Sequence, residues 1–338
     1  MSNYKIFRTF APEFNYQRRR NRMKMKNYLA VMALLLLASA CQNDDGNEPA
    51  GGEQMVAVSF GGPVVTLRPA LAQAAVTRAS DEAFETGDEI GIFAVKKQAG
   101  AYTLLAADNY ADNHCYRCES DGSFSNQSGE YIWQYPRPKL AYDLCYWAVY
   151  PYSSSLTVPT FYYNVEADQS VAANYAQSDL CLDSVHSLAV DVEFKMRHVM
   201  ACIEVNLSGE GLAGHTFDAY VSEEVSKGVA VNLNAMTIVA TAATVGNITC
   251  RQTTESDGSI TFRALVAPQV IELGGDFFSV VIDGDSAHPL EFDCPRTQAI
   301  SSGKRWKLML ELNADGELLY EGSAVDNYGS GSGMPLDP

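Results

Sequence analysis

The stretch VDVEFKMRHVMACIEVNL, residues 190–207, carries two runs of alternating apolar and polar residues that differ in phase. Successive side chains of a β-strand point to opposite faces, so each run predicts a half-buried strand. A single straight strand with both runs would turn its apolar face to water, and we therefore expect a bulge or bend between Arg197 and Cys202. His198 lies at that break; we interpret it as a hydrogen-bonded structural histidine, with a ligand role as the alternative. The even apolar set is Val190, Val192, Phe194 and Met196, and the odd set is Ile203, Val205 and Leu207.

Strand patterns recur along the rest of the chain. Ile90–Val95 is a continuous apolar run after a Gly-Asp turn, which predicts a strand buried on both faces. Phe277–Ile282 predicts another buried strand, and Trp306–Leu312 alternates cleanly. Long amphipathic helical patterns are hard to find, whereas the 18 tyrosines and 14 phenylalanines favour strands. The sequence therefore predicts an all-β protein.

The charge of the chain is strongly asymmetric. Eight basic residues and one acidic residue precede Cys41, so the remainder holds 16 basic and 40 acidic residues, a net charge of −24. Such a surface repels nucleic acids and anionic lipids, and we expect neither as a partner.

An export signal is predicted before Cys41. Two lysines precede the apolar run Leu29–Leu37, which is too short to span a bilayer, and the small residues Ala38–Ala40 follow it. A start at Met23 or Met25 would give this signal an ordinary length.

The residues around Cys41 resemble the lipobox of bacterial lipoproteins, in which the cysteine becomes the acylated first residue. The following Gln42–Asp45 is similar to the surface-export tag of Bacteroidetes lipoproteins. The alternative is an ordinary cleaved signal with an incidental cysteine. On the first interpretation, everything after Cys41 is an extracytoplasmic protein on a lipid tether.

The chain has eight cysteines, and acylation of Cys41 would leave seven, an odd number that cannot all pair. Cys145, Cys202 and Cys294 stand within apolar strand-like runs, where a free cysteine acts as a small hydrophobic residue. We therefore expect buried free thiols.

The segment His114-Cys115-Tyr116-Arg117-Cys118 is the one chemically suggestive cluster. Two cysteines at this spacing can bind zinc or exchange electrons as a dithiol, but zinc takes four ligands and no second such pair is present. We predict a loop with two incidental thiols or a local disulfide, and keep His114, Cys115 and Cys118 as weak metal candidates.

Catalytic motifs of the common classes are missing from the sequence. There is no GxSxG, HExxH, phosphate-binding loop or calcium loop, and Asp283 and Asp285 lack the other ligands of such a loop. We predict a protein that is not an enzyme and needs no cofactor.

Several segments together resemble the fimbrillin family, the pilin-like lipoproteins of Bacteroidetes fimbriae. The resemblance covers residues 55–330 and lies in an N-terminal FETGDEIGIFAV segment and in aromatic, DQS, histidine, PQ and GK-aromatic segments that follow in order. These segments are Phe84–Val95, Tyr131–Tyr152, Asp168–Leu180, Phe194–Val205, Ala267–Gln269 and Ile300–Trp306.

The resemblance implies a fimbrial subunit or surface adhesin at the cell outer membrane. In such pilins a trypsin-like protease cuts after an arginine, the first strand is released, and a strand of the next subunit fills the groove. Arg78 stands where that arginine would be, with Arg68 as a competing site, and Met55–Phe60 would be the released strand. The donor strand would come from Glu317–Tyr328, and the partners would be other fimbrial subunits and the processing protease.

We therefore expect two β-sandwich domains of transthyretin or Greek-key type in tandem after a lipoprotein signal peptide. The boundaries are 1–40 for the signal, 41–54 for a lipid-anchored linker, 55–190 and 191–328 for the two domains, and 329–338 for a flexible tail.

Two other functions remain open on sequence alone. A monomeric surface lipoprotein could bind glycans through exposed aromatic rings, but Trp133, Trp147 and Trp306 lie in strand-like runs and are expected in the core. A thiol or zinc enzyme built on Cys115 and Cys118 is the third alternative.

Overall fold

The computed structural model describes residues 54–61, 84–137, 139–222, 224–241 and 246–328, and all statements below concern these residues. They belong to one compact unit that begins at Gln54. Outside the described residues lie the expected signal 1–40, all but the last residue of the linker, Cys41, Arg68, Arg78 and the tail 329–338.

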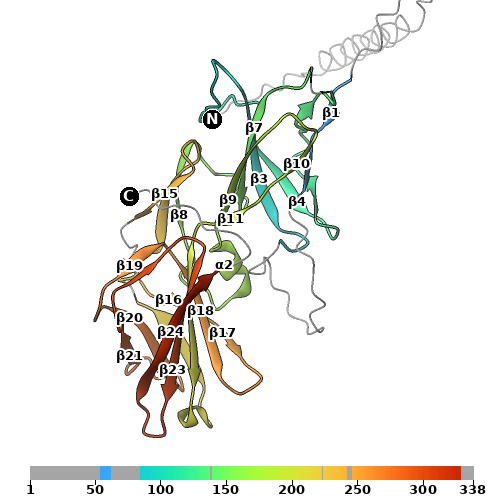
Figure 1. Ribbon diagram of the computed structural model, residues 1–338. Coiled ribbons are helices and arrows are strands. Elements are labelled where there is room, and N and C mark those ends of the chain that lie inside the picture. The colour runs from blue at the N-terminus through green and yellow to red at the C-terminus, as the bar shows by residue number, and fades with distance from the viewer. Residues whose placement is uncertain (1–53, 62–83, 138, 223, 242–245, 329–338) are drawn as a thin grey trace, which may run out of the picture. The chain divides into compact units, whose positions relative to one another are not determined.

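Within these ranges the chain forms twenty-four strands, one α-helix and one 3-10 helix (Figure 1). The fold is all-β, as the sequence predicts. The elements are β1 (Val56–Ala57), β2 (Ser59–Gly61), β3 (Glu89–Lys96), β4 (Ala111–Cys118), β5 (Ser123–Asn126), β6 (Trp133–Gln134), β7 (Leu144–Tyr150), β8 (Thr160–Asn164), α2 (Ala172–Gln177), β9 (Cys181–Ser187), β10 (Asp191–Glu193), β11 (Arg197–His198), β12 (Ala201–Ser208), η1 (Glu210–Leu212), β13 (Phe217–Val221), β14 (Gly228–Asn232), β15 (Thr237–Thr241), β16 (Ile248–Thr249), β17 (Arg251–Thr254), β18 (Ile260–Val266), β19 (Gln269–Ile271), β20 (Asp276–Ile282), β21 (Leu290–Asp293), β22 (Gln298–Ile300), β23 (Lys304–Leu312) and β24 (Leu318–Asn327).

An eight-stranded sheet in the order β10-β2-β5-β4-β3-β7-β9-β11 contains most strands of the first half of the described chain. Its strands β4, β3 and β7 lie side by side in Figure 1. On β3, Ile90 and Ile92 pack into one hydrophobic cluster and Phe93 and Val95 into another. The first, which also holds Phe60, is called the Phe60 cluster below, and the second is called the main core. A strand between two apolar layers carries apolar residues at every position, so the predicted burial of β3 on both faces is confirmed.

The break predicted in residues 190–207 lies at Val199 and Met200. Before the break, β10 pairs with β2 and β11 pairs with β9, both within the eight-stranded sheet. After the break, β12 pairs with β18 and β23 in a five-stranded sheet. Both break residues are completely buried. The change of phase therefore marks the point where the chain passes from one sheet to another. The domain boundary at 190 and 191 stays a prediction.

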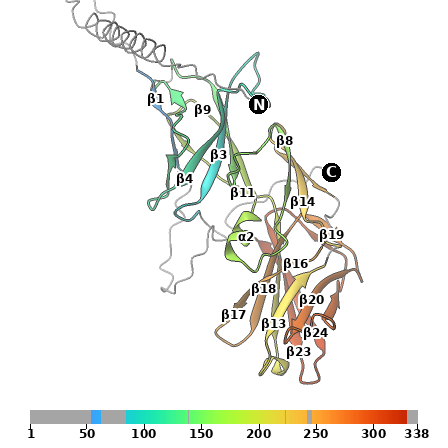
Figure 2. The ribbon, with the colours of Figure 1, turned by 180° about the vertical axis from the view of Figure 1, so that it is seen from behind.

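The five-stranded sheet β17-β18-β12-β23-β24 packs against the four-stranded sheet β16-β13-β20-β21. Phe277 of β20 stacks on Trp306 of β23 with ring centroids 5.2 Å apart, and Phe278 lies 6.2 Å from Phe262 of β18. Figure 2 shows β20, β23 and β24 from behind. The alternating residues Trp306, Leu308, Leu310 and Leu312 are all buried, which confirms the strand predicted there.

Two smaller sheets complete the second half of the described chain. One, in the order β15-β14-β8, joins β8 to strands more than sixty residues later, and the other pairs β19 with β22. Local sequence patterns contain no information on such distant pairings.

The outward face of β12 carries an ion-pair network. Glu204, only 9% exposed, accepts hydrogen bonds from Arg263 at 2.7 Å and Arg305 at 3.3 Å. Arg305 and Lys307 also pair with Asp326 of β24, at 3.0 and 2.8 Å. Because four neighbouring strands contribute to it, the network fixes their order as well as satisfying the buried carboxylate.

We expect Leu308→Ala to lower the free energy of unfolding by about 2–5 kcal/mol, because it leaves a cavity in the main core. Met309→Ala is the matched control. The Met309 side chain, next to Leu308 on the strand, is 44% exposed, so its loss changes the free energy of unfolding by about 0.5 kcal/mol or less. Urea unfolding followed by tryptophan fluorescence measures both. Equal effects at the two positions would contradict the assigned orientation of β23.

Candidate functional site

The second strand, β2, occupies an internal position in the eight-stranded sheet. β2 lies between β10, to which it is parallel, and β5, to which it is antiparallel, while β1 pairs with β6. The single strand expected over Met55–Phe60 is wrong in this respect. The amide of Val58 donates to Ile132 O at 2.8 Å, whereas the amide of Ser59 donates to Val190 O at 2.8 Å. Consecutive amides thus bond to different neighbours, and this divides the strand.

Phe60 is the main apolar contact of this segment. Its ring lies 4.9 Å from that of Tyr116 and 5.6 Å from those of Tyr146 and Phe194, between centroids. Phe60 is 2% and Val58 3% exposed. The segment therefore packs into the Phe60 cluster through side chains two residues apart, Val58 and Phe60, and backbone hydrogen bonds to neighbouring strands hold it on both sides.

The cluster at His114–Cys118 forms the second half of β4, so the loop expected there is wrong. Cys118 packs with Tyr116 in the Phe60 cluster, whereas Cys115 alternates with them and points to the opposite face of the strand. The two thiols cannot share one metal ion or form a disulfide, because an odd separation on a strand places side chains on opposite faces.

Burial controls the chemistry of these three residues. It raises the pKa of Cys115 and of Cys118 to about 11, so both thiols are protonated and unreactive at neutral pH. Burial also lowers the pKa of His114, whose Nε2 lies 3.4 Å from the Glu130 carboxylate.

None of the seven cysteines in the described residues forms a disulfide bond, and six are buried. Cys202 and Cys294 are at most 1% exposed and Cys145 is half-buried. The expectation of buried thiols outside disulfide bonds is confirmed for Cys202 and Cys294.

A different group of ligand-type side chains meets near the end of the eight-stranded sheet. Cys181 of β9 pairs directly with His198 of β11, and Asp179 precedes Cys181 by two residues. His198 Nδ1 lies 2.8 Å from Asp179 Oδ1 and 3.4 Å from Cys181 Sγ. The sequence analysis identified His198 but not its partners, because strand pairing rather than sequence spacing brings them together. The only sequence signal was the Asp-x-Cys spacing, which places both side chains on one face of an extended chain.

This group is buried and electrically coupled. Burial, the largest single cause, would by itself lower the pKa of His198, but the charges and hydrogen bonds of Asp179 and Cys181 together outweigh it and raise that pKa well above its usual value. Burial, followed by the nearby Asp179 carboxylate, raises the pKa of Cys181 to about 11. Tyr328 covers the group: its ring centroid lies 4.5 Å from that of His198, and its hydroxyl is 3.4 Å from Asp179 Oδ2. The predicted hydrogen-bonded state of His198 is confirmed.

Exposed aromatic rings gather near β6. Trp133 is 46% and Tyr131 50% exposed, with ring centroids 6.0 Å apart. The expectation that all three tryptophans lie in the core is therefore wrong for Trp133, although Trp147 and Trp306 are buried. On β6 it is Gln134, with no exposed surface, that faces inward, and alternation turns Trp133 to solvent.

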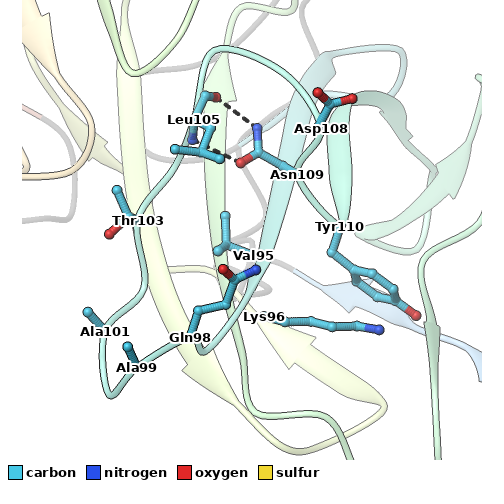
Figure 3. Close-up of a pocket in the computed structure, with 10 residues that line it drawn as sticks. All are labelled: Val95, Lys96, Gln98, Ala99, Ala101, Thr103, Leu105, Asp108, Asn109 and Tyr110. Carbon is cyan, nitrogen blue, oxygen red and sulfur yellow. Dashed lines mark hydrogen bonds between the residues drawn. The ribbon is translucent and has the colours of Figure 1, made fainter.

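A pocket of about 480 Å³ lies under the loop between β3 and β4. Figure 3 shows its polar side chains, including Gln98, Asp108 and Asn109, with Asn109 closing the loop through two hydrogen bonds to Leu105. Tyr110, at the pocket rim, donates its hydroxyl to Trp133 O at 2.7 Å. Tyr110 thus links the pocket to the backbone of Trp133.

None of the helices in the described part of the chain has the length and hydropathy that a membrane span requires. A model of the fimbrillin-like family matches residues 77–326, well over half of the chain. The chain belongs to the fimbrillin-like family.

Solved structures share the fold of this fimbrillin-like chain. A candidate cell adhesion protein from Bacteroides uniformis is 18% identical, with a TM-score of 0.55, and the match covers 81% of this chain and 99% of the other. A candidate cell adhesion protein from Bacteroides ovatus is 17% identical, with a TM-score of 0.57, covering 82% and 100%. No curated protein sequence matches the chain. At these identities the likeness shows the fold alone.

Family membership indicates a fimbrial subunit or an adhesin, a structural role at the cell surface rather than catalysis. This confirms the resemblance drawn from the sequence segments. In this fimbrillin-like chain the internal strand β2 and the aromatic rings around Phe60 form the candidate site for contact with other subunits.

We expect Phe60→Ala to lower the free energy of unfolding by about 3–5 kcal/mol, because three aromatic rings lose their common neighbour. Val56→Ala serves as the control, since Val56 is 38% exposed and its replacement costs less than about 1 kcal/mol. Chemical denaturation of both variants checks this. A small loss for Phe60→Ala would mean that the Phe60 cluster closes without the ring.

Proposed function

We propose that this chain is a fimbrial subunit that assembles by donor-strand exchange. Proteolysis after Arg78 releases the segment with β1 and β2, and a strand of the next subunit takes its place. Three observations support this: the internal position of β2, the packing of Phe60 among buried aromatic rings, and the family match that begins at residue 77, after β2 and next to the expected cut.

The geometry of β2 defines what a replacement strand has to provide. Loss of β2 would leave unpaired backbone groups on β5 and β10 and would expose Phe194 and Tyr116, which are at most 2% exposed in the intact sheet. An extended segment with apolar side chains two residues apart would restore both the hydrogen bonds and the packing. Main-chain hydrogen bonds would supply the affinity for the replacement strand, and the space that Phe60 leaves in the Phe60 cluster would set the register of that strand.

The last strand, β24, is suited to be the donor. It is an edge strand, paired only with β23, and most of its side chains are exposed. Leu319, Tyr320 and Val325 are each at least 40% exposed, so its release would remove little apolar burial from its own subunit. An edge strand with exposed apolar side chains is the kind of element that pairs with another chain.

The remaining parts of the proposal concern export. Acylation at Cys41 anchors the precursor to the outer membrane, and a trypsin-like surface protease cuts it there. The small residues before Cys41 and the acidic segment after it support this. Cleavage would then couple assembly to arrival at the surface.

The test is limited trypsin treatment, under native conditions, of the protein that begins at residue 42. We expect one early cut after Arg78, followed by growth in light scattering and by polymers that resist SDS. Mass spectrometry maps the cut. Arg78→Gln should abolish both cut and growth, whereas Arg68→Gln should leave them unchanged.

A second comparison separates cleavage from donor-strand exchange. A chain that ends at Asp315 lacks β24, and we expect it to be cut after Arg78 without polymerising. Its polymerisation would exclude the C-terminal donor, and a clean cut of the intact chain without assembly would reject the strand-exchange subunit.

Glycan binding is a second candidate function, favoured by the exposed Tyr131–Trp133 pair. Indole and phenol rings that face solvent can stack on the apolar faces of sugars, and the pocket that Tyr110 links to the Trp133 backbone would supply amide and carboxylate groups for hydroxyls. This function is compatible with a fimbrial adhesin.

We expect Trp133→Ala to weaken binding in a glycan-array screen and in titration with the best glycan at least tenfold. Leu140→Ala is the control, because Leu140 is also about half exposed (49%) but is not aromatic. Equal loss in both variants, or no glycan bound by the parent protein, would reject this function.

A further inference from the structure

We propose that Asp179, Cys181 and His198 form a binding site for a zinc ion. Their ligand atoms lie within 4.8 Å of one another, and this is the one such group of three found among the described residues. The inference does not depend on the proposed function.

The protein backbone places the three ligands on a rigid support. Cys181 and His198 are directly opposite each other on β9 and β11, and the ladder continues through Val199 N, which donates to Leu180 O at 2.7 Å. Ser302 Oγ donates to His198 O at 2.9 Å and holds the far side of β11. A site on paired strands needs little reorganisation on binding.

The distances agree with tetrahedral coordination. Zinc bonds of about 2.0–2.3 Å to nitrogen, oxygen and sulfur, at tetrahedral angles, place the ligand atoms about 3.3–3.6 Å apart. The observed separations are 2.8 Å from His198 Nδ1 to Asp179 Oδ1, 3.4 Å from Nδ1 to Cys181 Sγ, and 3.8 Å from Sγ to Oδ1. Shifts of about half an ångström would make room for the ion.

The charges balance without any redox step. The ion displaces the thiol proton of Cys181 and the Nδ1 proton of His198, and both protons go to solvent. One carboxylate, one thiolate and a neutral imidazole then offset the double positive charge, so the buried site stays neutral overall. Three protein ligands leave the fourth tetrahedral position for a water molecule.

The ligand set selects the kind of ion. A thiolate with an imidazole and one carboxylate oxygen suits a borderline-soft ion such as zinc, whereas calcium and magnesium require oxygen ligands. The His198 side chain keeps 13% exposure, which gives an ion access. Tyr328 would tune the site, because its hydroxyl lies 3.4 Å from Oδ2, the carboxylate oxygen that is not counted as a ligand.

The test is titration with Co²⁺ of the protein that begins at residue 42, after a chelator has removed its metals. We expect one equivalent to bind with a near-ultraviolet thiolate-to-cobalt band, and Zn²⁺ to abolish that band by competition. Zn²⁺ should also raise the melting temperature. The absence of a thiolate band at micromolar Co²⁺ would overturn the proposal.

Variants decide which thiol is responsible. Cys181→Ser should remove the band, and Cys118→Ser, also buried on a strand, should retain it. Tyr328→Phe should keep the band and lower zinc affinity about tenfold. A band that persists in Cys181→Ser would also refute the site. Should that variant fail to fold, Asp179→Asn and the zinc-dependent melting temperature of the parent protein still decide the matter.

Discussion

When one extended segment passes from one sheet to another, the positions of its inward-facing side chains have to change from one alternating set to the other. In this chain the change takes place at Val199 and Met200. Upstream, Val192 and Phe194 point into the Phe60 cluster from β10 and the residues after it; downstream, Ile203 and Val205 point into the main core from β12. The two sheets depend on this short buried break, because β12 is a central strand of one and β10 pairs with β2 in the other.

Local alternation was enough to predict the strands that carry the core. Residues on β3 and β23 are buried as their patterns indicate, because burial on a strand depends on position within two residues. Most of the family segments could be read for the same reason, since they mark strands or turns; the exception is Asp168–Leu180, which contains the helix α2. Pairing across long separations, such as β8 with β14, was not predictable, because nothing near either strand specifies its partner.

The errors about sites have one physical cause. The sequence spacing of the residues was interpreted without the strand geometry that decides which face each side chain points to. Two cysteines three residues apart resemble a metal pair on a loop, yet on β4 they face opposite sides. Trp133 looked apolar and therefore internal, but Gln134 takes the inward position through its hydrogen bonds with the backbone of Tyr142 and Tyr135. Conversely, the ladder between β9 and β11 assembles a group that sequence spacing does not display.

The end of β24 connects the assembly proposal with that group. Most of β24 can leave its sheet at little apolar cost, but Tyr328 is 1% exposed and rests on His198 and Asp179. A donor strand that includes Tyr328 must first break these contacts, so the buried group acts as the anchor of an otherwise loosely packed strand. Any change that holds Asp179 and His198 more firmly in place would strengthen this anchor and delay the release of β24. If β24 is the donor strand, the stability of the free subunit and its readiness to polymerise would therefore oppose each other at Tyr328.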